Sequence, residues 1–447
     1  MSRVRFSAAL TAALALVFTS LASAAYAAAP PVDPGEGNVE VRVTYAAVDL
    51  IPGDEVEVSF WKLDEATSTY LPVEDPEWYA TDTTWTSADL APGSYSVRFL
   101  ADDVSLGLQW WRGARYFVES EDIVVQAGAT TALGTVELKE RTLDVDRIAG
   151  ADRFATAANI AREAVDGTAP VVYLTNGMNY PDALAAGPGA IASGGVLLLT
   201  QPGTLPAATR GELATLKPAR VVIVGGSGAV SPAVEGAVKK LLPKARVDRL
   251  GGADRYATGD RIVRDAFRGG ADIAIIATGR NYPDALAAGP AAGAIGAPVI
   301  LLDGVAKTVP AATLKLLKDL KVKHLFIAGG TGAVSSGIET SLRKAGYGSA
   351  DILRLAGGSR YETATMLNTA VFGATDVAFV ANGLNFPDAL AGAPLAGAWG
   401  APLFLTPPAC MGQDAAAGIV SHRSNGLILL GGTGALSPAV ERFTLCG

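Results

Sequence analysis

The sequence predicts an α/β protein: three tandem modules built on parallel β-sheets, preceded by a small all-β sandwich. In residues 141–447, short apolar runs at 171–174, 196–199 and 221–224 alternate with stretches of helical pattern. Such runs are typical of strands buried on both faces of a parallel sheet. The second observation is that the same motifs return three times in this region, about 100 residues apart. Units of that length have the size of a domain rather than of a solenoid repeat.

The all-β prediction concerns residues 37–140. Apolar and polar residues alternate there with a period of two, as at Val39, Val41 and Val43, and turn signals such as Pro92-Gly93 separate the runs. Alternation of this kind predicts half-buried strands, and several short strands predict a β-sandwich. The segment 89–97 also resembles the turn and strand of carboxypeptidase-regulatory-like or prealbumin-like β domains.

The N-terminal residues predict export. Arg3 and Arg5 precede an apolar stretch over residues 8–18, and Ala25-Tyr26-Ala27 has the form of a signal peptidase site. The stretch is shorter than the roughly 20 residues that a membrane-spanning helix needs. We therefore interpret residues 1–27 as a signal peptide and residues 28–36 as a linker. No later segment has the length and apolar character of a membrane span.

Charge is distributed unevenly along the 447 residues, whose net charge is −8. Residues 30–140 hold 21 acidic and 6 basic residues, whereas residues 141–447 hold 23 acidic and 28 basic ones. A basic surface suits an anionic polymer, so such a partner is expected of the C-terminal part.

The only two cysteines, Cys410 and Cys446, predict a single disulfide near the C-terminus in an oxidising compartment. A cysteine-based metal site would need more ligands, and the two histidines stand far apart in the sequence. We therefore expect no metal.

Three motifs recur in the same order in each module. The first contains an arginine, the second reads Asn-Tyr/Phe-Pro-Asp-Ala-Leu, and the third is a Gly-Gly-Ser/Thr-Gly loop. The motifs stand at 150–157, 252–259 and 357–364; at 179–188, 281–290 and 385–394; and at 225–235, 329–339 and 431–441. The repetition predicts modules at 141–243, 244–347 and 348–447.

The arginine of the first motif and the aspartate of the second have two interpretations. Arg153 and Asp182 are 29 residues apart, a spacing that recurs in the other modules, and they could form a structural ion pair within one module. Asp182 could also act locally, with Pro181 in the first turn of a helix and the carboxylate near its positive end. In the functional interpretation, each arginine presents its planar fork to a phosphate or carboxylate of a polymer.

The glycine loops each follow a buried strand and precede a helix. We expect Ser231 and Ser437 as N-caps and a capping box between Ser336 and Glu339. Such a loop can hold a phosphate at the helix N-terminus. The pattern Gly226-x-Gly228-x-x-Ser231 nevertheless lacks the third glycine of a dinucleotide fingerprint. A tight turn with close packing is therefore the first interpretation, and contact with an anionic ligand is the second.

Together these motifs closely resemble the cell wall binding repeat type 2 family of Gram-positive surface proteins, over residues 143–447. The resemblance implies three modules with Rossmann- or flavodoxin-like sheets around a pseudo-threefold axis. It also implies a secreted protein held at the cell wall or cell surface by an anionic wall polymer, either teichoic-acid-like or another secondary wall polysaccharide. In the third module Gly357-Gly358-Ser359 replaces Gly-Ala-Asp, so its ligand site need not be equivalent to the others.

The residues expected to contact the polymer are the arginines, asparagines and aspartates of the first two motifs, together with the glycine loops and their N-caps. They are Arg153, Asn179, Asp182, Arg255, Asn281, Asp284, Arg360, Asn385 and Asp388, with Gly226, Gly228, Ser231, Gly330, Gly332, Ser335, Gly432, Gly434 and Ser437 in the loops.

The prominent polar residues appear three times, whereas an active site usually needs a distinctive set once. We expect no enzyme activity, no cofactor and no nucleic-acid partner. Two other functions remain open. One is a wall-remodelling hydrolase or amidase. The other is adhesion or carbohydrate binding through the β-sandwich, whose Trp78, Trp85, Trp110 and Trp111 could stack on sugars, although core packing is the commoner use of tryptophan.

Overall fold

The computed structural model describes residues 32, 34–46, 48–52, 55–66, 69–73, 76–80, 84–103 and 105–447. The predicted signal peptide, residues 1–27, lies outside them. The chain forms two compact units. Unit 1 contains the described residues up to Asp144 together with Ala374–Asp376 and Arg423–Gly426, and unit 2 contains the remainder.

Unit 1 is built from two β-sheets, as the alternating pattern predicts. One has the order β10-β1-β6-β5, with β2 beside β1, and the other has the order β4-β3-β7-β8, with β9 beside β7. The strands are β1 (Asn38–Tyr45), β2 (Val48–Leu50), β3 (Val56–Asp64), β4 (Thr69–Pro72), β5 (Trp78–Ala80), β6 (Trp85–Ser87), β7 (Gly93–Ala101), β8 (Gln109–Trp110), β9 (Ile123–Val125) and β10 (Thr130–Glu137), with short 3₁₀ turns η1 (Trp111–Gly113) and η2 (Phe117–Glu119).

Tryptophans of unit 1 take part in packing. Trp110 is only 3% exposed, and Trp78 and Trp111 pack against the core around Val41 and Phe60. The Trp110 indole donates a hydrogen bond of 2.8 Å to Asp376, which also accepts one of 2.7 Å from the backbone N–H of Phe117. Trp110 therefore has no face free for a sugar.

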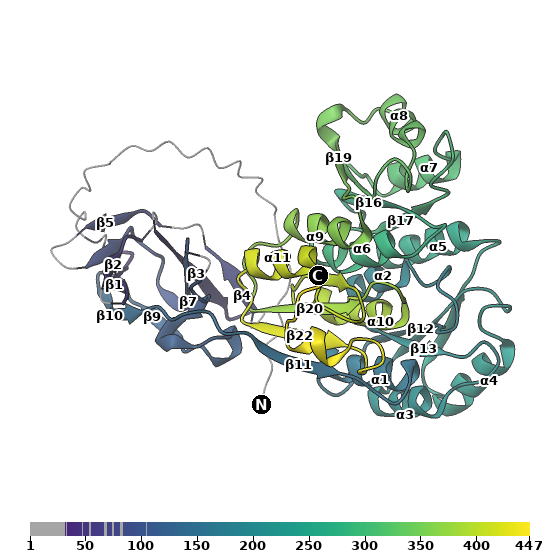
Figure 1. Ribbon diagram of the computed structural model, residues 1–447, viewed down its shortest axis with the longest axis horizontal. Helices are drawn as coiled ribbons and strands as arrows, with labels where there is room; N and C mark the ends of the chain where they lie inside the picture. Colours follow the sequence, from purple (N-terminus) through teal and green to yellow (C-terminus); the bar gives the residue numbers. More distant parts are fainter. Residues whose placement is uncertain are drawn as a thin grey trace. The chain divides into compact units, whose positions relative to one another are not determined.

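Unit 2 contains three four-stranded sheets and the helices that cover them (Figure 1). Its strands are β11 (Asp144–Ile148), β12 (Val171–Asn176), β13 (Val196–Thr200), β14 (Arg220–Val224), β15 (Arg246–Leu250), β16 (Ile273–Thr278), β17 (Val299–Leu302), β18 (His324–Ala328), β19 (Ile352–Leu355), β20 (Val377–Asn382), β21 (Leu403–Thr406) and β22 (Gly426–Leu430). Its helices are α1 (Arg153–Ala164), α2 (Ala186–Ala192), α3 (Ala207–Leu216), α4 (Pro232–Leu241), α5 (Arg255–Ala266), α6 (Pro283–Ala294), α7 (Ala311–Asp319), α8 (Ser336–Lys344), α9 (Arg360–Thr369), α10 (Pro387–Ala398), α11 (Gln413–Ser421) and α12 (Pro438–Glu441), with a 3₁₀ turn η3 (Ser349–Asp351).

The three sheets share one topology. Each consists of three strands of one repeat and a fourth strand that belongs to another repeat. Their orders are β13-β12-β14-β15, β17-β16-β18-β19 and β21-β20-β22-β11. The strands β15 and β19 directly precede the first helix of the following repeat, so they link each sheet to the next. The strand β11 stands at the start of the first repeat, yet it pairs with β22 of the third. The repeats are thus joined in a closed ring.

Strands buried on both faces explain the continuous apolar runs. In β12 and β13, Tyr173 and Leu197 belong to a central cluster that all three repeats share. Their neighbours Val172 and Leu198 belong to a separate cluster with residues of α3 and α4. Both faces of the sheet are therefore covered by helices, and the predicted parallel-sheet α/β architecture after an all-β region is confirmed.

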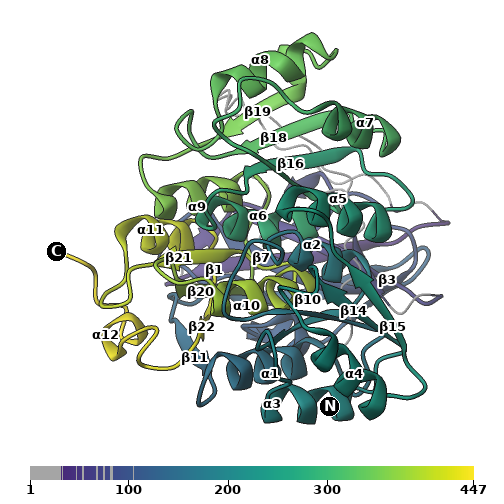
Figure 2. The ribbon, with the colours of Figure 1, turned by 90° about the vertical axis from the view of Figure 1, so that its right-hand side faces the viewer.

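Three equivalent helices, α2, α6 and α10, pack against one another at the centre of unit 2 (Figure 2). Ile191 of α2 occupies the place where its equivalents, Gly293 and Gly397, have no side chain, because a Cβ at either glycine would collide with the Ile191 side chain. One large and two small residues therefore let three helices meet around a pseudo-threefold centre.

Two local expectations need correction. Pro283 and Pro387 begin α6 and α10 as predicted, but Pro181 lies in a turn before α2, which begins only at Ala186. The capping box predicted for Ser336 does not form. Ser335 is the N-cap of α8 and accepts from the Ile338 N–H, whereas Glu339 pairs with arginines.

Cys410 and Cys446 are joined by a disulfide, with Cα atoms 5.1 Å apart. The bond ties the chain end to the loop after β21. A search for a helix of sufficient length and apolar character to cross a bilayer finds none in the described part of the chain.

Candidate functional site

The repeated arginines are the first residues of α1, α5 and α9. Each guanidinium donates through Nη1 to the carbonyl that follows the first strand of its sheet: Arg153 to Gly177 at 2.7 Å, Arg255 to Gly279 at 2.6 Å and Arg360 to Gly383 at 2.8 Å. No other hydrogen bond from these guanidiniums to protein is found among the described residues. Each half-buried arginine thus keeps most of its five donors for another partner.

The helix caps beside these arginines explain why the third repeat has Gly357-Gly358-Ser359 in place of Gly-Ala-Asp. Asp152 caps α1 and Asp254 caps α5, whereas Ser359 caps α9. In α9, Glu362 accepts from the Gly358 N–H at 2.6 Å while Ser359 accepts from the Glu362 N–H at 3.1 Å. The acidic group has therefore moved from the N-cap to the first turn, and the helix start is still capped.

The aspartates of the second motif lie against the glycine loop of the same repeat. Gly225, Gly329 and Gly431 have φ values of +99°, +103° and +103°, which L side chains rarely adopt. A Cβ at Gly225 would come within 2.8 Å of Asp182 Oδ2, and Asp284 and Asp388 would be struck in the same way. The first glycine of each loop is therefore required by its conformation and by the aspartate.

For two of the aspartates, Asp284 and Asp388, the nearby arginine charge comes from a different repeat. Burial raises the pKa of Asp284 to about 6, and the positive charge of Arg360 in the third repeat opposes that rise. Burial likewise raises the pKa of Asp388 to about 6, against the effect of Arg153 in the first repeat. No ion pair within 4.0 Å joins Arg153 to Asp182 in the described structure, so the predicted pairing within one module is wrong. Arg360 and Asp284, and likewise Arg153 and Asp388, form no ion pair within 4.0 Å among the described residues, but each of these arginine charges acts on the aspartate of the adjacent repeat.

An aromatic triangle connects these boundaries. The rings of Tyr180 and Tyr282 are 5.2 Å apart, and both lie near Phe386, at 5.8 and 6.1 Å. Arg153 lies 5.9 Å from the Phe386 ring centroid, and Arg360 lies 5.9 Å from that of Tyr282. Each of these arginines therefore faces both the aspartate and the aromatic ring of the preceding repeat in the closed ring.

The glycine loops offer backbone donors. In the first loop, the N–H groups of residues 226–228 have no acceptor among the described residues, and the same holds for residues 330–332 and 432–434. A Cβ at Gly226, Gly228, Gly332, Gly432 or Gly434 would meet nothing within 4 Å. These glycines are therefore not required by packing, and consecutive free N–H groups can bind an anion.

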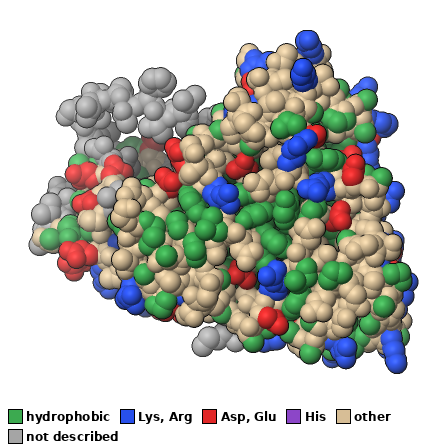
Figure 3. Space-filling model, turned by 45° about the vertical axis from the view of Figure 1, so that its right-hand side comes forward, with side chains coloured by type: hydrophobic (Ala, Val, Ile, Leu, Met, Phe, Trp, Pro, Cys, Tyr) green, Lys and Arg blue, Asp and Glu red, His purple; other side chains and the backbone are tan. Residues whose placement is uncertain are grey.

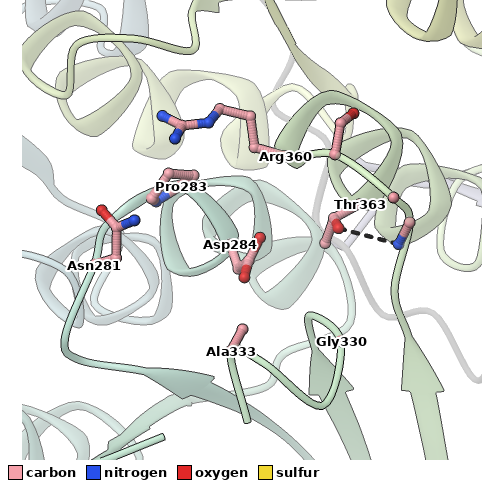
Figure 4. A pocket seen from close by; sticks show the side chains of 10 residues that line it. Asn281, Pro283, Asp284, Gly330, Ala333, Arg360 and Thr363 are labelled. Carbon is pink, nitrogen blue, oxygen red and sulfur yellow. Dashed lines mark hydrogen bonds between the residues drawn. The ribbon is translucent and has the colours of Figure 1, made fainter.

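A pocket of about 230 Å³ brings the three motifs together at the boundary between the second and third repeats (Figure 4). Asp284 of α6 and Arg360 of α9 lie on different sides of it, with Asn281, Gly330 and Ala333 completing the wall. Thr363 Oγ1 accepts from the Gly357 N–H at 3.1 Å and fixes the far edge. This is a polar, open pocket in which an anion could meet both a guanidinium and free backbone N–H groups.

The other predicted residues take equivalent positions. Asn179, Asn281 and Asn385 each accept a hydrogen bond from the N–H of the next residue, at 3.0, 2.9 and 3.0 Å. Ser231, Ser335 and Ser437 are the N-caps of α4, α8 and α12.

The sequence interpretation missed a further set of arginines that hold the glycine loops. Arg249 donates to the carbonyls of Gly225 and Val230 and pairs with Glu235 at 2.7 Å. Arg354 and Arg147 bind the second and third loops in the same way, through Glu339 and Glu441. The signal was present in the sequence, because an arginine stands just before the apolar end of β11, β15 and β19 in each repeat.

The comparison with protein families decides the relationship of the chain. The model of the cell wall binding domain 2 family (CWB2) matches residues 147–235, 249–339 and 354–441, which together make up more than half of the chain. The chain belongs to the CWB2 family. Each matched CWB2 repeat begins in a borrowed strand and ends in the helix that follows a glycine loop.

Two curated proteins of Bacillus subtilis (strain 168) are similar to the chain. The N-acetylmuramoyl-L-alanine amidase LytC is 30% identical over 296 residues, which is 66% of this chain and 57% of the amidase. The amidase enhancer is 32% identical over 252 residues, which is 56% of this chain and 33% of that protein. The chain thus spans only about half or less of the length of these relatives.

Two solved structures share the fold. Cwp6 from Clostridium difficile has a TM-score of 0.62 at 22% identity, covering 88% of this chain and 63% of its own. Cwp8 from the same organism has a TM-score of 0.61 at 21% identity, with 87% and 63% covered. The CWB2 repeats support association with the cell wall.

Proposed function

We propose that unit 2 attaches the protein non-covalently to the bacterial cell wall by binding an anionic secondary wall polymer at the boundaries between its CWB2 repeats. The observation that carries this proposal is the half-buried arginine at each boundary. It uses a single N–H on a carbonyl and lies near free N–H groups of a glycine loop. A guanidinium with several open donors suits phosphate and carboxylate groups.

Three such boundaries in one closed ring suit a repeating polymer. Once one group of the polymer is bound, the next binding event is intramolecular, so weak sites add up to firm attachment. In the complete proposal, residues 1–27 direct export and are removed, and unit 1 is displayed at the cell surface.

The test compares binding to purified wall sacculi for the wild type and for Arg153→Gln, Arg255→Gln and Arg360→Gln. Each variant is expected to bind roughly tenfold more weakly, because a charge-assisted contact is lost. Arg210→Gln, on the exposed surface of α3, is the matched control and should bind like the wild type. Walls stripped of polymers other than peptidoglycan should retain little protein. Unchanged binding of all three variants, or equal binding to stripped walls, would contradict the proposal.

The amidase among the relatives makes peptidoglycan hydrolysis the alternative. The matched length of 296 residues is close to the span of the CWB2 repeats, residues 147–441, which supports a relationship through wall attachment. A zymogram with the purified chain decides between the two, since a clear lytic band would favour the hydrolase.

A further inference from the structure

A second concave surface lies in the CWB2 repeat that contains α7 and α8, and the proposed function does not use it. It encloses about 720 Å³ and is lined by Lys315, Lys318, Lys321 and Lys323, with Tyr347 and Asp351 on the opposite wall. We call it the lysine pocket. Figure 3 shows several basic side chains at the upper end of the molecule, where α7 and α8 lie in Figure 1, among others spread over the same face.

The positive charge of the lysine pocket is only partly compensated. Lys315 pairs with Asp319 and Lys323 with Asp272, at 2.8 and 3.0 Å. Lys318 and Lys321 have no ion pair within 4.0 Å among the described residues, and both are exposed. Asp351, the one acidic residue in the lining, already accepts from the Gly348 N–H at 2.8 Å.

The lysine pocket is separate from the boundary sites. Lys323 precedes β18, whereas the glycine loop that contributes to the boundary pocket begins at Gly329, directly after β18 ends. A strand of five residues is about 15 Å long. The two pockets therefore lie at opposite ends of the same strand, and one bound group cannot occupy both.

The fold itself does not require these lysines. Residues 314–323 contain four of them, whereas the corresponding helix and turn of the first repeat have only Arg210 and Lys217, and those of the third have only Arg423. A basic residue at the left-handed position after the helix is common to all three, with φ of 41°, 60° and 57°. The additional lysines are specific to the second repeat, which points to a ligand rather than to the shared architecture.

We propose that the lysine pocket binds phosphate groups of a polyanionic chain, as a contact additional to the boundary sites. The ligand class rests on the proposed function, since the same wall polymer can reach both surfaces. Phosphate is favoured over carboxylate because lysine binds phosphate as a compact point charge and lacks the planar fork that matches a carboxylate. The half-buried Tyr347 ring offers an apolar wall for the carbon skeleton between phosphates.

The test uses the full chain and two soluble probes, poly(glycerol phosphate) and the carboxylate polymer polygalacturonate. In the variant Lys318→Gln/Lys321→Asn, asparagine tolerates the left-handed backbone at 321. The variant is expected to bind poly(glycerol phosphate) roughly three- to tenfold more weakly, with a smaller dependence on salt. Lys240→Gln/Lys244→Gln removes the same charge from exposed positions in the first repeat and should leave the affinity unchanged.

The inference is overturned if the pocket variant binds like the wild type, if the control loses as much affinity, or if polygalacturonate shows the same dependence on Lys318 and Lys321. Thermal unfolding of both variants checks that the fold is intact. The wall-binding proposal is tested by a separate measurement, the binding of Arg360→Gln to purified wall sacculi. If Arg360→Gln loses wall binding while Lys318→Gln/Lys321→Asn binds poly(glycerol phosphate) like the wild type, the wall-binding proposal is supported and the lysine-pocket proposal is rejected.

Discussion

At the scale of single residues, the boundary sites are made from aspartates that folding partly removes from water. The carboxyl groups of Asp284 and Asp388 titrate near 3.8 when unperturbed and near 6 in the folded protein. The folded state therefore holds their protons more tightly than the unfolded state. The contribution of these two groups to the free energy of unfolding therefore decreases as pH rises from about 4 to 6, and the loss persists at higher pH.

The variant Asp284→Asn/Asp388→Asn keeps the shape of both side chains and removes the ionisation. Its free energy of unfolding should therefore exceed that of the wild type by roughly 1–3 kcal/mol at pH 7.5, and should vary less between pH 4 and 6. Denaturant unfolding at several pH values measures both quantities.

Asp319→Asn is the control, and its effect on the free energy of unfolding should have the opposite sign. Hydrogen bonds from Lys315 and Arg264 lower the pKa of Asp319, so its ionised form favours folding. Its replacement should reduce stability slightly at neutral pH and have no effect at low pH. A double variant whose stability follows the wild-type pH profile would contradict the assignment of Asp284 and Asp388.

At the scale of single elements, the glycines of one loop motif differ in what fixes them: some are required by the backbone conformation and some are not. Gly329 is constrained by its φ of +103° and by the adjacent Asp284 carboxylate. Gly332, three residues later, has open space where a Cβ would be. Gly329 is needed for the turn, whereas Gly332 is not required by packing.

Gly329→Ala should therefore destabilise the protein by about 1–3 kcal/mol, because the alanine is strained and collides with the carboxylate. Gly332→Ala, the matched substitution in the same loop, should change stability by less than about 0.5 kcal/mol. Thermal unfolding compares the two. If the two variants lose the same stability, packing constrains both glycines and the distinction between them is wrong.

At the scale of the whole molecule, the three repeats form a ring that is closed by strand β11. Arg147 on β11 donates to the Gly431 carbonyl at 2.7 Å and pairs with Glu441 at 2.9 Å, almost 300 positions later in the chain. The third glycine loop is thus held by a residue at the start of the first repeat. The ring explains why the repeats share one central core.

Arg147→Gln should therefore loosen the third loop, although the substitution lies at the start of the first repeat. We expect faster amide hydrogen exchange in residues 431–441 and a loss of about 1–3 kcal/mol in stability. Arg249→Gln, the matched variant, should instead loosen residues 225–235. Protection of 431–441 that is unaffected by Arg147→Gln would contradict closure through this contact.

From the amino-acid sequence alone, the elements and the threefold repetition could be predicted, and the repeated Arg, Asp and glycine residues could be proposed as binding residues. Apolar runs such as 171–174 predict buried strands because burial on both faces leaves no polar position, and the repeated Arg, Asp and glycine motifs mark one edge of each sheet. Which copies of these residues lie near one another became clear only from the folded chain. Asp284 lies near Arg360 of the third repeat rather than near Arg255 of its own. The strand β11 of the first repeat likewise belongs to the sheet of the third. Because each sheet is completed by a strand of another repeat, neighbouring repeats are brought together at these positions. Spacing within the chain cannot distinguish these partners, since every repeat offers the same residues at nearly the same interval.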